Sequence, residues 1–303
     1  IVLATGGFPQ SAEMRAKLSG RFPHGYTMAF EGNTGDGMVA ARAVGAAIDT
    51  ETVSPAFWTP ASILPHKDGR QEAIIYGYLD RGRPGVIAVK PDGKRFVNES
   101  NSYHDIVMAM FEQCDDPSQG FHFICDGNFI KRHGLGAIRP APWSMPLSYF
   151  SRRGYIVLDK TLTGLARKIG VNPEALENTV SRHNRFVATG QDEDFGRGNT
   201  AYNRIWGDPT VGPNPNLAEI KGTPFVALRI VPATLGTVVG LKTDADGAVL
   251  DDTGVPVPKL YACGNDLASP MRGFYPAGGV TLGPAVVFAW RAINRIALAT
   301  KPT

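Results

Sequence analysis

The chain has 303 residues, of which 43% are apolar and 19% are charged, so it is long enough to bury one large core or two smaller ones. Its net charge of +3 at pH 7 is too small for a nucleic-acid-binding surface, and no apolar run reaches the roughly 18 residues of a membrane span. The three widely spaced cysteines, Cys114, Cys125 and Cys263, match neither a disulfide framework nor a zinc site. This cysteine usage predicts a reducing compartment, the cytoplasm.

The predicted elements begin with a buried strand at Ile1–Ala4 that runs directly into the glycines Gly6 and Gly7. A start of this kind is typical of an internal segment, so we expect the sequence to be a truncated form of a longer chain. A short helix follows, with Ser11 as its N-cap, because a serine hydroxyl accepts an unpaired N–H of the first helical turn.

A second turn, Asn33–Gly37, opens a predicted helix of small residues over Met38–Ala47. The spacing Gly35-x-Gly37-x-x-Ala40 matches the dinucleotide fingerprint in part. That fingerprint needs a buried strand directly before it and an acidic residue about twenty positions later, and the residues before this match are too polar. We therefore interpret the match as coincidental and expect the phosphate-binding turn to be absent from this chain.

The middle of the chain mixes strands and helices with proline-rich turns. The segments Gly85–Lys90 and Lys94–Val97 predict a hairpin around a Pro-Asp-Gly turn. A helix over Ser100–Gln113 and a strand over Phe121–Cys125 are predicted next.

An amphipathic helix is predicted over Pro173–Thr189 from its apolar periodicity. The polar segment Asp192–Asn216 is rich in glycine and proline and predicts a loop, with Asp192–Asp194 as a solvated turn. Four residues at helical spacing are expected on the apolar face of the helix: Leu176, Val180, His183 and Val187.

Short strands return towards the C-terminus, and a helix of small and apolar residues is predicted over Thr281–Ala299. The strands are predicted at Phe225–Val231, Thr237–Thr243, Ala248–Leu250 and Leu260–Ala262. This order predicts an α/β fold. One lobe is built from both chain ends, residues 1–50 and 225–303, and an α+β cap lobe, residues 51–224, is inserted between them.

The glycine-rich loop before the last helix is the most specific local pattern. The strand that ends at Gly264 is followed by a loop over 273–279, which leads into the helix. The N–H groups at the N-terminus of that helix suit an anion or a reduced ring. A loop that only turns the chain is the alternative interpretation.

Four segments in this order resemble the fumarate reductase/succinate dehydrogenase flavoprotein superfamily: Ile1–Phe8, Asn33–Gly37, Lys94–Glu99 and Leu260–Pro284. The resemblance covers essentially the whole chain and implies FAD as the cofactor, with the turn for its pyrophosphate in an N-terminal segment that this chain lacks. The lobe of both chain ends is then an incomplete FAD-binding lobe, and the cap lobe binds the substrate. The residues that the resemblance places near FAD are Gly6, Gly7, Asp36, Asn265, Thr281 and Leu282. Asp36 is also expected to be the N-cap of its helix.

Dicarboxylate reductases of this superfamily hold their substrate with cationic side chains, since bidentate arginine–carboxylate pairs are strong. At the matching positions this chain has Tyr103 in place of an arginine, no histidine within 234–238, and no arginine within 276–279. The same positions resemble 3-ketosteroid Δ1-dehydrogenases, which carry a tyrosine after Asn-Glu-Ser and a Tyr-Pro-Gly-x-Gly loop. One departure is Ala277, which stands at the first glycine of that loop and would be strained at a positive φ.

By that resemblance, Tyr103 is the base that removes the proton next to a ketone, and the Tyr275 O–H and Gly279 N–H bind the carbonyl oxygen. A phenol and a backbone N–H form an uncharged oxyanion hole that suits a small apolar ketone. The resemblance therefore implies an FAD-dependent oxidoreductase that dehydrogenates a C–C bond next to a ketone, as in a 3-ketosteroid.

Two other interpretations stay open. Without the pyrophosphate turn the chain would be a non-catalytic fragment that does not retain FAD, and its uncovered sheet edge would favour a homodimer. A fumarate reductase-like enzyme would instead act on an unsaturated acid. Two further side chains are expected outside the chemistry: His104 as a surface or capping residue rather than a partner of Tyr103, and Arg272 as a solvated loop residue rather than a substrate clamp.

Overall fold

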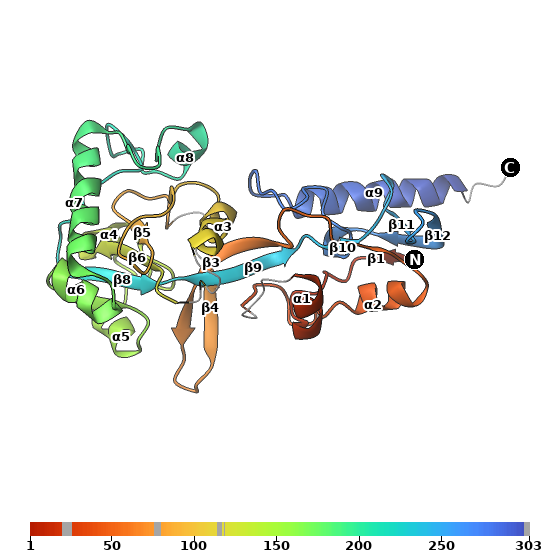
Figure 1. Cartoon of the computed structure of the whole chain (residues 1–303), viewed down its shortest axis with the longest axis horizontal. Helices are drawn as coiled ribbons and strands as arrows, with labels where there is room; N and C mark the ends of the chain where they lie inside the picture. Colours follow the sequence, from red (N-terminus) through yellow and green to blue (C-terminus); the bar gives the residue numbers. More distant parts are fainter. Residues whose placement is uncertain (20–25, 76–79, 114–116, 118, 300–303) are drawn as a thin grey trace. The chain divides into compact units, whose positions relative to one another are not determined.

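The computed structural model of the chain describes residues 1–19, 26–75, 80–113, 117 and 119–299, so Cys114 lies outside the described residues. Mixed α/β structure is divided between two units (Figure 1). We call Ile1–Trp58 together with Ala233–Thr303 the terminal unit, and Thr59–Pro232 the middle unit. The units divide after residues 58 and 232, whereas the sequence predicts domain boundaries after residues 50 and 224.

A three-stranded sheet forms the centre of the terminal unit. β1 (Val2–Leu3) pairs in parallel with β12 (Pro256–Ala262), and β12 pairs antiparallel with β11 (Ala248–Leu250). A smaller antiparallel sheet joins β2 (Ile48–Asp49) to β10 (Gly240–Leu241). Because β1 and β12 come from opposite ends of the chain, this sheet ties the two ends together.

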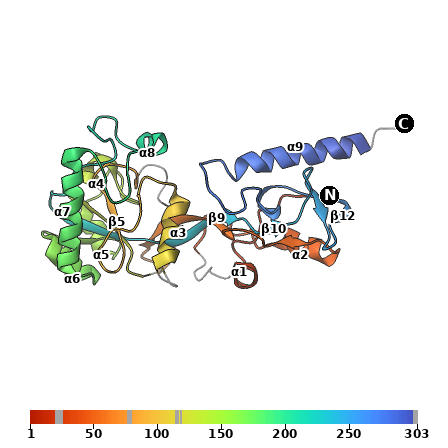
Figure 2. The same ribbon diagram turned by 45° about the horizontal axis from the view of Figure 1, so that its top comes forward.

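Helices lie on both faces of the three-stranded sheet. The C-terminal helix α9 (Leu282–Ala299) lies along one face, and α1 (Ala12–Leu18) and α2 (Asp36–Ala43) lie on the other (Figures 1 and 2). Residues from the strands, the helices and the loops between them form one apolar core. Its most buried members are Phe8, Met38, Ala46, Val239, Leu241, Val249 and Ala262.

The middle unit is built on a four-stranded antiparallel sheet in the order β5-β6-β8-β7. Its strands are β5 (Ile87–Val89), β6 (His122–Asp126), β8 (Phe225–Arg229) and β7 (Val157–Asp159). The hairpin predicted at 85–97 is present, since the Lys90 N–H donates to the Lys94 carbonyl at 3.0 Å and Val89 bridges to Arg95.

Three further strands also belong to this fold. β3 (Ala56–Pro65) forms an antiparallel hairpin with β4 (Gln71–Ile75). β3 and β9 (Val231–Thr237) contain the points at which the chain passes from one unit to the other.

Helices α6 (Leu162–Ile169) and α7 (Pro173–Thr189) pack together beside the four-stranded sheet. Their shared core includes Leu165, Leu176 and Val180. The remaining helices of the middle unit are α3 (Tyr103–Gln113), α4 (Gly127–His133), α5 (Leu147–Arg152) and α8 (Ala201–Ile205).

The amphipathic helix α7 confirms its prediction at both ends. The Asn172 side chain caps the N-terminus by accepting from the Ala175 N–H, and Gly190 ends the helix in the left-handed conformation at φ 73°. His183 is buried as expected, but Phe186 rather than Val187 completes the apolar face. Spacings of three and four residues lie on the same helix face, so the sequence pattern alone did not choose between them.

The predicted boundaries of two helices, α2 and α3, were wrong. Helix α2 begins at Asp36 after Gly35, which is its N-cap, so Asp36 is not the cap; the helix ends at Ala43, before the left-handed Gly45. Helix α3 begins at Tyr103 rather than Ser100. The residues before Tyr103 are held outside the helix by side-chain hydrogen bonds, as described below.

The polar segment 192–216 differs most from its prediction. It contains the short helix α8, and Asp192 is only 3% exposed rather than part of a solvated turn. Buried polar residues of this segment are Asp192, Arg197, Asn203, Asp208, Asn214 and Asn216.

No helix within the described ranges is long and apolar enough to cross a membrane. Cys125 and Cys263 are buried free thiols. The reducing compartment stays a prediction.

Candidate functional site

A buried carboxylate organises the first glycine turn of the terminal unit. Asp266 is fully buried and accepts hydrogen bonds from the Thr5 N–H, from the Thr5 hydroxyl at 2.8 Å and from the Gly7 N–H at 3.1 Å. Gly6 and Gly7 both have positive φ, at 94° and 75°. Because three donors converge on one carboxylate, the turn after β1 is fixed to the loop after β12.

The second turn packs against the first. A Cβ added to Gly37 would lie 2.6 Å from the Thr5 hydroxyl, and one added to Gly6 would lie 2.7 Å from the Asn33 side chain. Asp36 directly precedes Gly37 and is the first residue of α2. It is exposed and accepts a hydrogen bond from the Thr34 hydroxyl at 2.8 Å. The structure therefore brings Gly6, Gly7 and Asp36 into one cluster.

Asn265 links that cluster to the last helix. A Cβ on Gly7 would lie 2.8 Å from the Asn265 carbonyl oxygen, and a Cβ on Gly236 would lie 2.6 Å from the Asn265 side chain. Asn265 also lines a small pocket with Thr281, directly before α9. The other lining residues are Phe57, Thr237, Gly264, Leu267, Ser269, Pro270, Val280 and Pro284.

Helix α9 directs its N-terminus to this region. Its first residue, Leu282, is 72% exposed, and the Ala285 N–H donates to the Thr281 carbonyl at 3.2 Å. The first-turn N–H groups of a helix lack intrahelical acceptors and carry the positive end of its dipole. Thr281 and Leu282 are therefore placed where an electronegative ring edge or an anion would be stabilised.

The loop before α9 holds the predicted carbonyl-binding residues. Tyr275 is 8% exposed and packs edge-on against Phe57, with ring centroids 5.5 Å apart and planes at 76°. Gly279 has φ 96°, and a Cβ on it would meet nothing within 4 Å. Ala277 is not strained, because the described non-glycine residues with positive φ are Lys259 and Arg272.

Arg272 is held by an ion pair. Its Nη1 lies 2.5 Å from the Asp49 carboxylate, and its Nη2 donates to the Glu51 carbonyl. The predicted solvated loop residue is thus a half-exposed structural bridge, and its charge is already neutralised.

Tyr103 lies in the middle unit as the first residue of α3 and is 5% exposed. The guanidinium carbon of Arg81 lies over its ring, 5.5 Å from the centroid. The next residue, His104, is 4% exposed, so the predicted surface position is wrong. Tyr275 and Gly279 belong to the terminal unit, so the three predicted catalytic residues come from both units.

A buried ion network supports the segment before α3. Glu99 accepts a bidentate pair from Arg95, at 2.9 and 2.7 Å, and a third contact from Arg197 at 3.2 Å. Arg95 also pairs in a bidentate manner with Asp192, at 3.0 and 2.9 Å. Burial tends to raise the pKa of Glu99, but the guanidinium groups of Arg95 and Arg197 outweigh it and hold that pKa below its usual range.

Amide side chains complete the network. Asn98 donates to the Asn203 side chain at 3.0 Å, Asn203 donates to the Asn101 side chain at 3.0 Å, and Asn216 donates to the Ser100 hydroxyl at 3.1 Å. The Asn-Glu-Ser-Asn motif is therefore satisfied by the polar segment 192–216. Its role in the structure is to position the start of α3.

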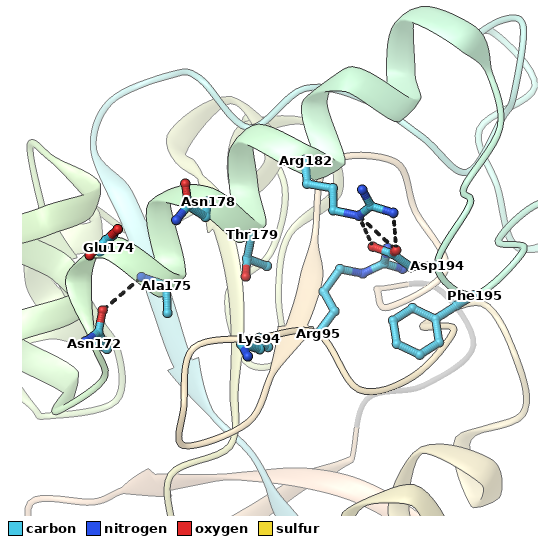
Figure 3. A pocket seen from close by; sticks show the side chains of 10 residues that line it. All are labelled: Lys94, Arg95, Asn172, Glu174, Ala175, Asn178, Thr179, Arg182, Asp194 and Phe195. Carbon is cyan, nitrogen blue, oxygen red and sulfur yellow. Dashed lines mark hydrogen bonds and ion pairs between the residues drawn. The ribbon is translucent and has the colours of Figure 1, made fainter.

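A pocket of about 640 Å³ lies beside this network, between α7 and the hairpin (Figure 3). Arg182 and Asp194 form an ion pair of 2.7 Å at one end, and Arg95 lies over the Phe195 ring at 5.0 Å (Figure 3). None of the predicted site residues lines the pocket, and three of its five charged residues, Arg95, Arg182 and Asp194, are paired with one another or with Asp192. We assign no chemistry to it.

The residues of the terminal unit fit a flavin dinucleotide. The glycine turns offer close backbone approach, the Asn265 amide and Thr281 hydroxyl offer hydrogen bonds, and α9 offers the positive end of its dipole. Within the described residues no cluster of histidine, cysteine and carboxylate side chains could hold a metal ion.

A model of the FAD binding domain matches residues 1–282. The chain belongs to this FAD binding domain family. It is 38% identical to 3-oxosteroid 1-dehydrogenase of Mycolicibacterium smegmatis, over 98% of this chain and 52% of that protein. It is 37% identical to 4-oxocyclohex-2-ene-1-carboxylate 5-dehydrogenase of Sinomonas cyclohexanicum, over 98% of this chain and 50% of that protein.

Among solved structures, the chain is similar to 3-ketosteroid Δ1-dehydrogenase of Sterolibacterium denitrificans in complex with 1,4-androstadiene-3,17-dione, with a TM-score of 0.88. The identity is 34%, and the match covers 99% of this chain and 53% of that chain. The chain thus spans about half the length of the relatives it matches. The resemblance predicted from the four ordered motifs is confirmed.

Three residues of the site were missed in the sequence. Asp266 follows Asn265 directly, and its position after a strand was the available signal. Arg81 and Arg197 lie in segments without periodicity, and both are fully buried. A fully buried arginine is rare unless paired, and no local pattern announces it.

Proposed function

We propose that the protein at the length of its relatives is an FAD-dependent oxidoreductase that dehydrogenates a C–C bond next to a ring ketone, such as a 3-ketosteroid. The observation that carries this proposal is the uncharged loop with Tyr275 buried against Phe57 and Gly279 at a positive φ in open space. The relatives support this proposal, since their names refer to oxo compounds of steroid and cyclohexene rings.

In this proposal Gly6, Gly7, Asp36, Asn265, Thr281 and Leu282 hold FAD. When bound, FAD supplies a hydride acceptor for the carbon β to the ketone. The Tyr275 O–H and the Gly279 N–H donate to the carbonyl oxygen and so stabilise the charge that develops there.

Tyr103 removes the proton from the α-carbon. A tyrosine has a reference pKa near 10, so it acts as a base only when its surroundings favour the phenolate. The roles of Tyr103, Tyr275 and Gly279 rest on the resemblance, and each residue has the chemistry that its role requires.

A reductase of an unsaturated dicarboxylic acid is the second candidate. It would need cations that are free to bind carboxylates. Arg272, the arginine of the loop before α9, is already paired with Asp49. The geometry therefore favours the ketone.

The test mixes the FAD-loaded protein, without oxygen, with a 4-ene-3-ketosteroid, with 4-oxocyclohexanecarboxylate, and with succinate. We expect the flavin absorbance at roughly 450 nm to bleach with a ketone and not with succinate, because the ketone substrate donates a hydride to the flavin. Tyr275→Phe should slow the bleaching about 10²-fold or more, as for loss of one oxyanion donor. Bleaching by succinate alone would reject the proposal, and Tyr149→Phe is the matched control on another helix.

A further inference from the structure

We propose that Arg81 is the positioning residue for Tyr103: it fixes the backbone that begins α3 and supplies the positive charge that favours the Tyr103 phenolate. This inference deepens the proposed function and rests on Tyr103 as the base. It concerns the described residues of the middle unit alone.

Arg81 fixes the position of Tyr103 through the backbone before α3. Arg81 is fully buried, and its Nη1 donates to the Glu99 carbonyl at 2.9 Å and to the Asn101 carbonyl. Both carbonyls belong to the short segment 99–101, which leads from the ion network into α3. Ser102 then caps the helix, with its hydroxyl 3.2 Å from the Asp105 N–H. Arg81 thereby sets where the first helical residue, Tyr103, is placed.

Arg81 also places a positive charge beside the Tyr103 ring. Within the described ranges, Nε and Nη2 of Arg81 have no hydrogen-bond partner of ordinary geometry, although the side chain is fully buried. The Tyr202 phenol acts on the Arg81 pKa as a hydrogen-bonding group. A buried cation with unpaired donors is costly unless a counter-charge is close. The Tyr103 ring, 5.5 Å from the guanidinium carbon, offers a cation–π contact in the neutral state and a counter-charge when ionised.

The two groups favour each other reciprocally. Burial lowers the pKa of Arg81, and Tyr202, Tyr103 and Asp105 act in the opposite direction. An ionised Tyr103 stabilises the guanidinium, so by linkage the guanidinium stabilises the phenolate by the same free energy.

Other charged and titratable groups surround this pair, and they decide which controls are needed. Asp105 and His104 lie on α3, and Tyr202 lies on α8. Burial raises the pKa of Asp80 to about 6, so its negative charge beside Arg81 is present mainly above that pH. Arg83 and Arg197 are the other cations near Arg81, and Arg197 is already paired with Glu99. Tyr202 is the rival phenol for the same guanidinium.

The test follows the tyrosine ionisations directly, with tyrosines labelled with ¹³C at Cζ and observed by NMR as the pH is raised. Tyr103→Phe and Tyr202→Phe assign the two resonances. We expect the Tyr103 phenol to ionise below the ordinary pH of about 10, and Arg81→Gln to raise that midpoint by about one to two pH units. Arg81→Lys should restore part of the shift, because it keeps a cation.

Arg132→Gln is the matched control, since Arg132 is half-exposed and pairs with Asp208 at 2.7 Å. It should leave the Tyr103 midpoint unchanged, and a thermal melt checks that each variant is folded. If Arg81→Gln does not fold, the pH midpoint of Tyr103 ionisation in the wild-type protein is the test. A Tyr103 midpoint at 10 or above, or a shift that belongs to Tyr202, overturns the inference.

The NMR titration of Tyr103 does not require catalytic turnover. A protein without ketone dehydrogenase activity but with an early Tyr103 ionisation would refute the proposed function and keep the role of Arg81. An active enzyme whose pH–rate profile does not move in Arg81→Lys and Arg81→Gln would refute the role of Arg81 and keep the function.

Discussion

At the scale of single residues, the terminal unit depends on positions where a side chain either must be absent or must be charged. Gly7 has a positive φ and lies against Thr237 and Asn265, so both its conformation and its surroundings require glycine. Asp266 holds the same turn from the other side with three accepted hydrogen bonds. The two residues together place the backbone that is proposed to approach FAD.

Gly7→Ala separates these two requirements when it is compared with Gly254→Ala. Gly254 also has a positive φ, of 83°, but a Cβ on it would meet nothing within 4 Å. We expect Gly254→Ala to lower the free energy of unfolding by about 1–2 kcal/mol through backbone strain alone. Gly7→Ala should cost about 1–3 kcal/mol more, because its Cβ overlaps the Asn265 carbonyl. Urea denaturation measures both, and equal losses would contradict the close packing at Gly7.

At the scale of elements, the start of α3 is positioned by segments far away in the chain. Glu99 lies between Arg95 and Arg197, and the ion network ties the hairpin and the polar segment 192–216 together. Helix α9 is mostly exposed, and among the described residues of that helix only Ala292 is buried. Its exposed apolar residues include Leu282, Val286, Trp290 and Ile293.

Glu99→Gln tests the energy of the network. Both carboxylate oxygens accept from arginines, and the side chain is 0% exposed, so the neutral amide leaves two buried cations undercompensated. We expect a loss of about 3–5 kcal/mol in the free energy of unfolding, measured by denaturant titration. Glu193→Gln is the control, because Glu193 is 65% exposed at 3.6 Å from Arg182 and should cost less than about 0.5 kcal/mol. Similar losses for both variants would show that the network does not stabilise the fold.

At the scale of the whole molecule, buried histidines are concentrated in the middle unit. Burial lowers the pKa of His122, His133 and His183 to about 4 in each case. His183 donates through Nε2 to the Ala218 carbonyl at 3.0 Å and is packed near Arg95 and Arg197. By sequence, the terminal unit contains a single histidine, His24, which lies outside the described residues.

This distribution predicts that acid destabilises the middle unit first. The unfolded histidine binds a proton near pH 6.5, whereas folded His183 binds one only near pH 4, so stability is full above 6.5 and falls as the pH drops towards 4. For His183 alone we expect a loss of about 2 kcal/mol between pH 7 and pH 5. Thermal melts at both pH values measure it, and His183→Gln should remove that part of the pH dependence.

The control for the acid effect is Asn184→Ala, since Asn184 is the next residue of α7, hydrogen-bonds Ile220 and carries no titratable group. Its melts should keep the wild-type difference between pH 7 and pH 5. A difference that is unchanged in His183→Gln would show that His183 is not the group that titrates.

The sequence by itself determined those features that depend on neighbouring residues. The bounds of α7, the Ser11 cap of α1, the glycine turn after β1 and the family resemblance were all predicted correctly, because caps, periodicity and positive-φ glycines act within a few residues. The candidate site residues Gly6, Gly7, Asn265 and Thr281 came from the resemblance to the flavoprotein superfamily, and the structure brings them together in the terminal unit.

Only the tertiary structure decided which polar side chains are buried. Asp192 was expected in water, yet it pairs with Arg95, 97 residues away in the chain. Arg81 and Asp266 acquired their contacts in the same way, from segments that no local pattern connects to them. A charged side chain is buried only when a partner compensates its lost hydration. Because that partner is supplied by folding, burial of charge is a property of the whole structure and not of the local sequence.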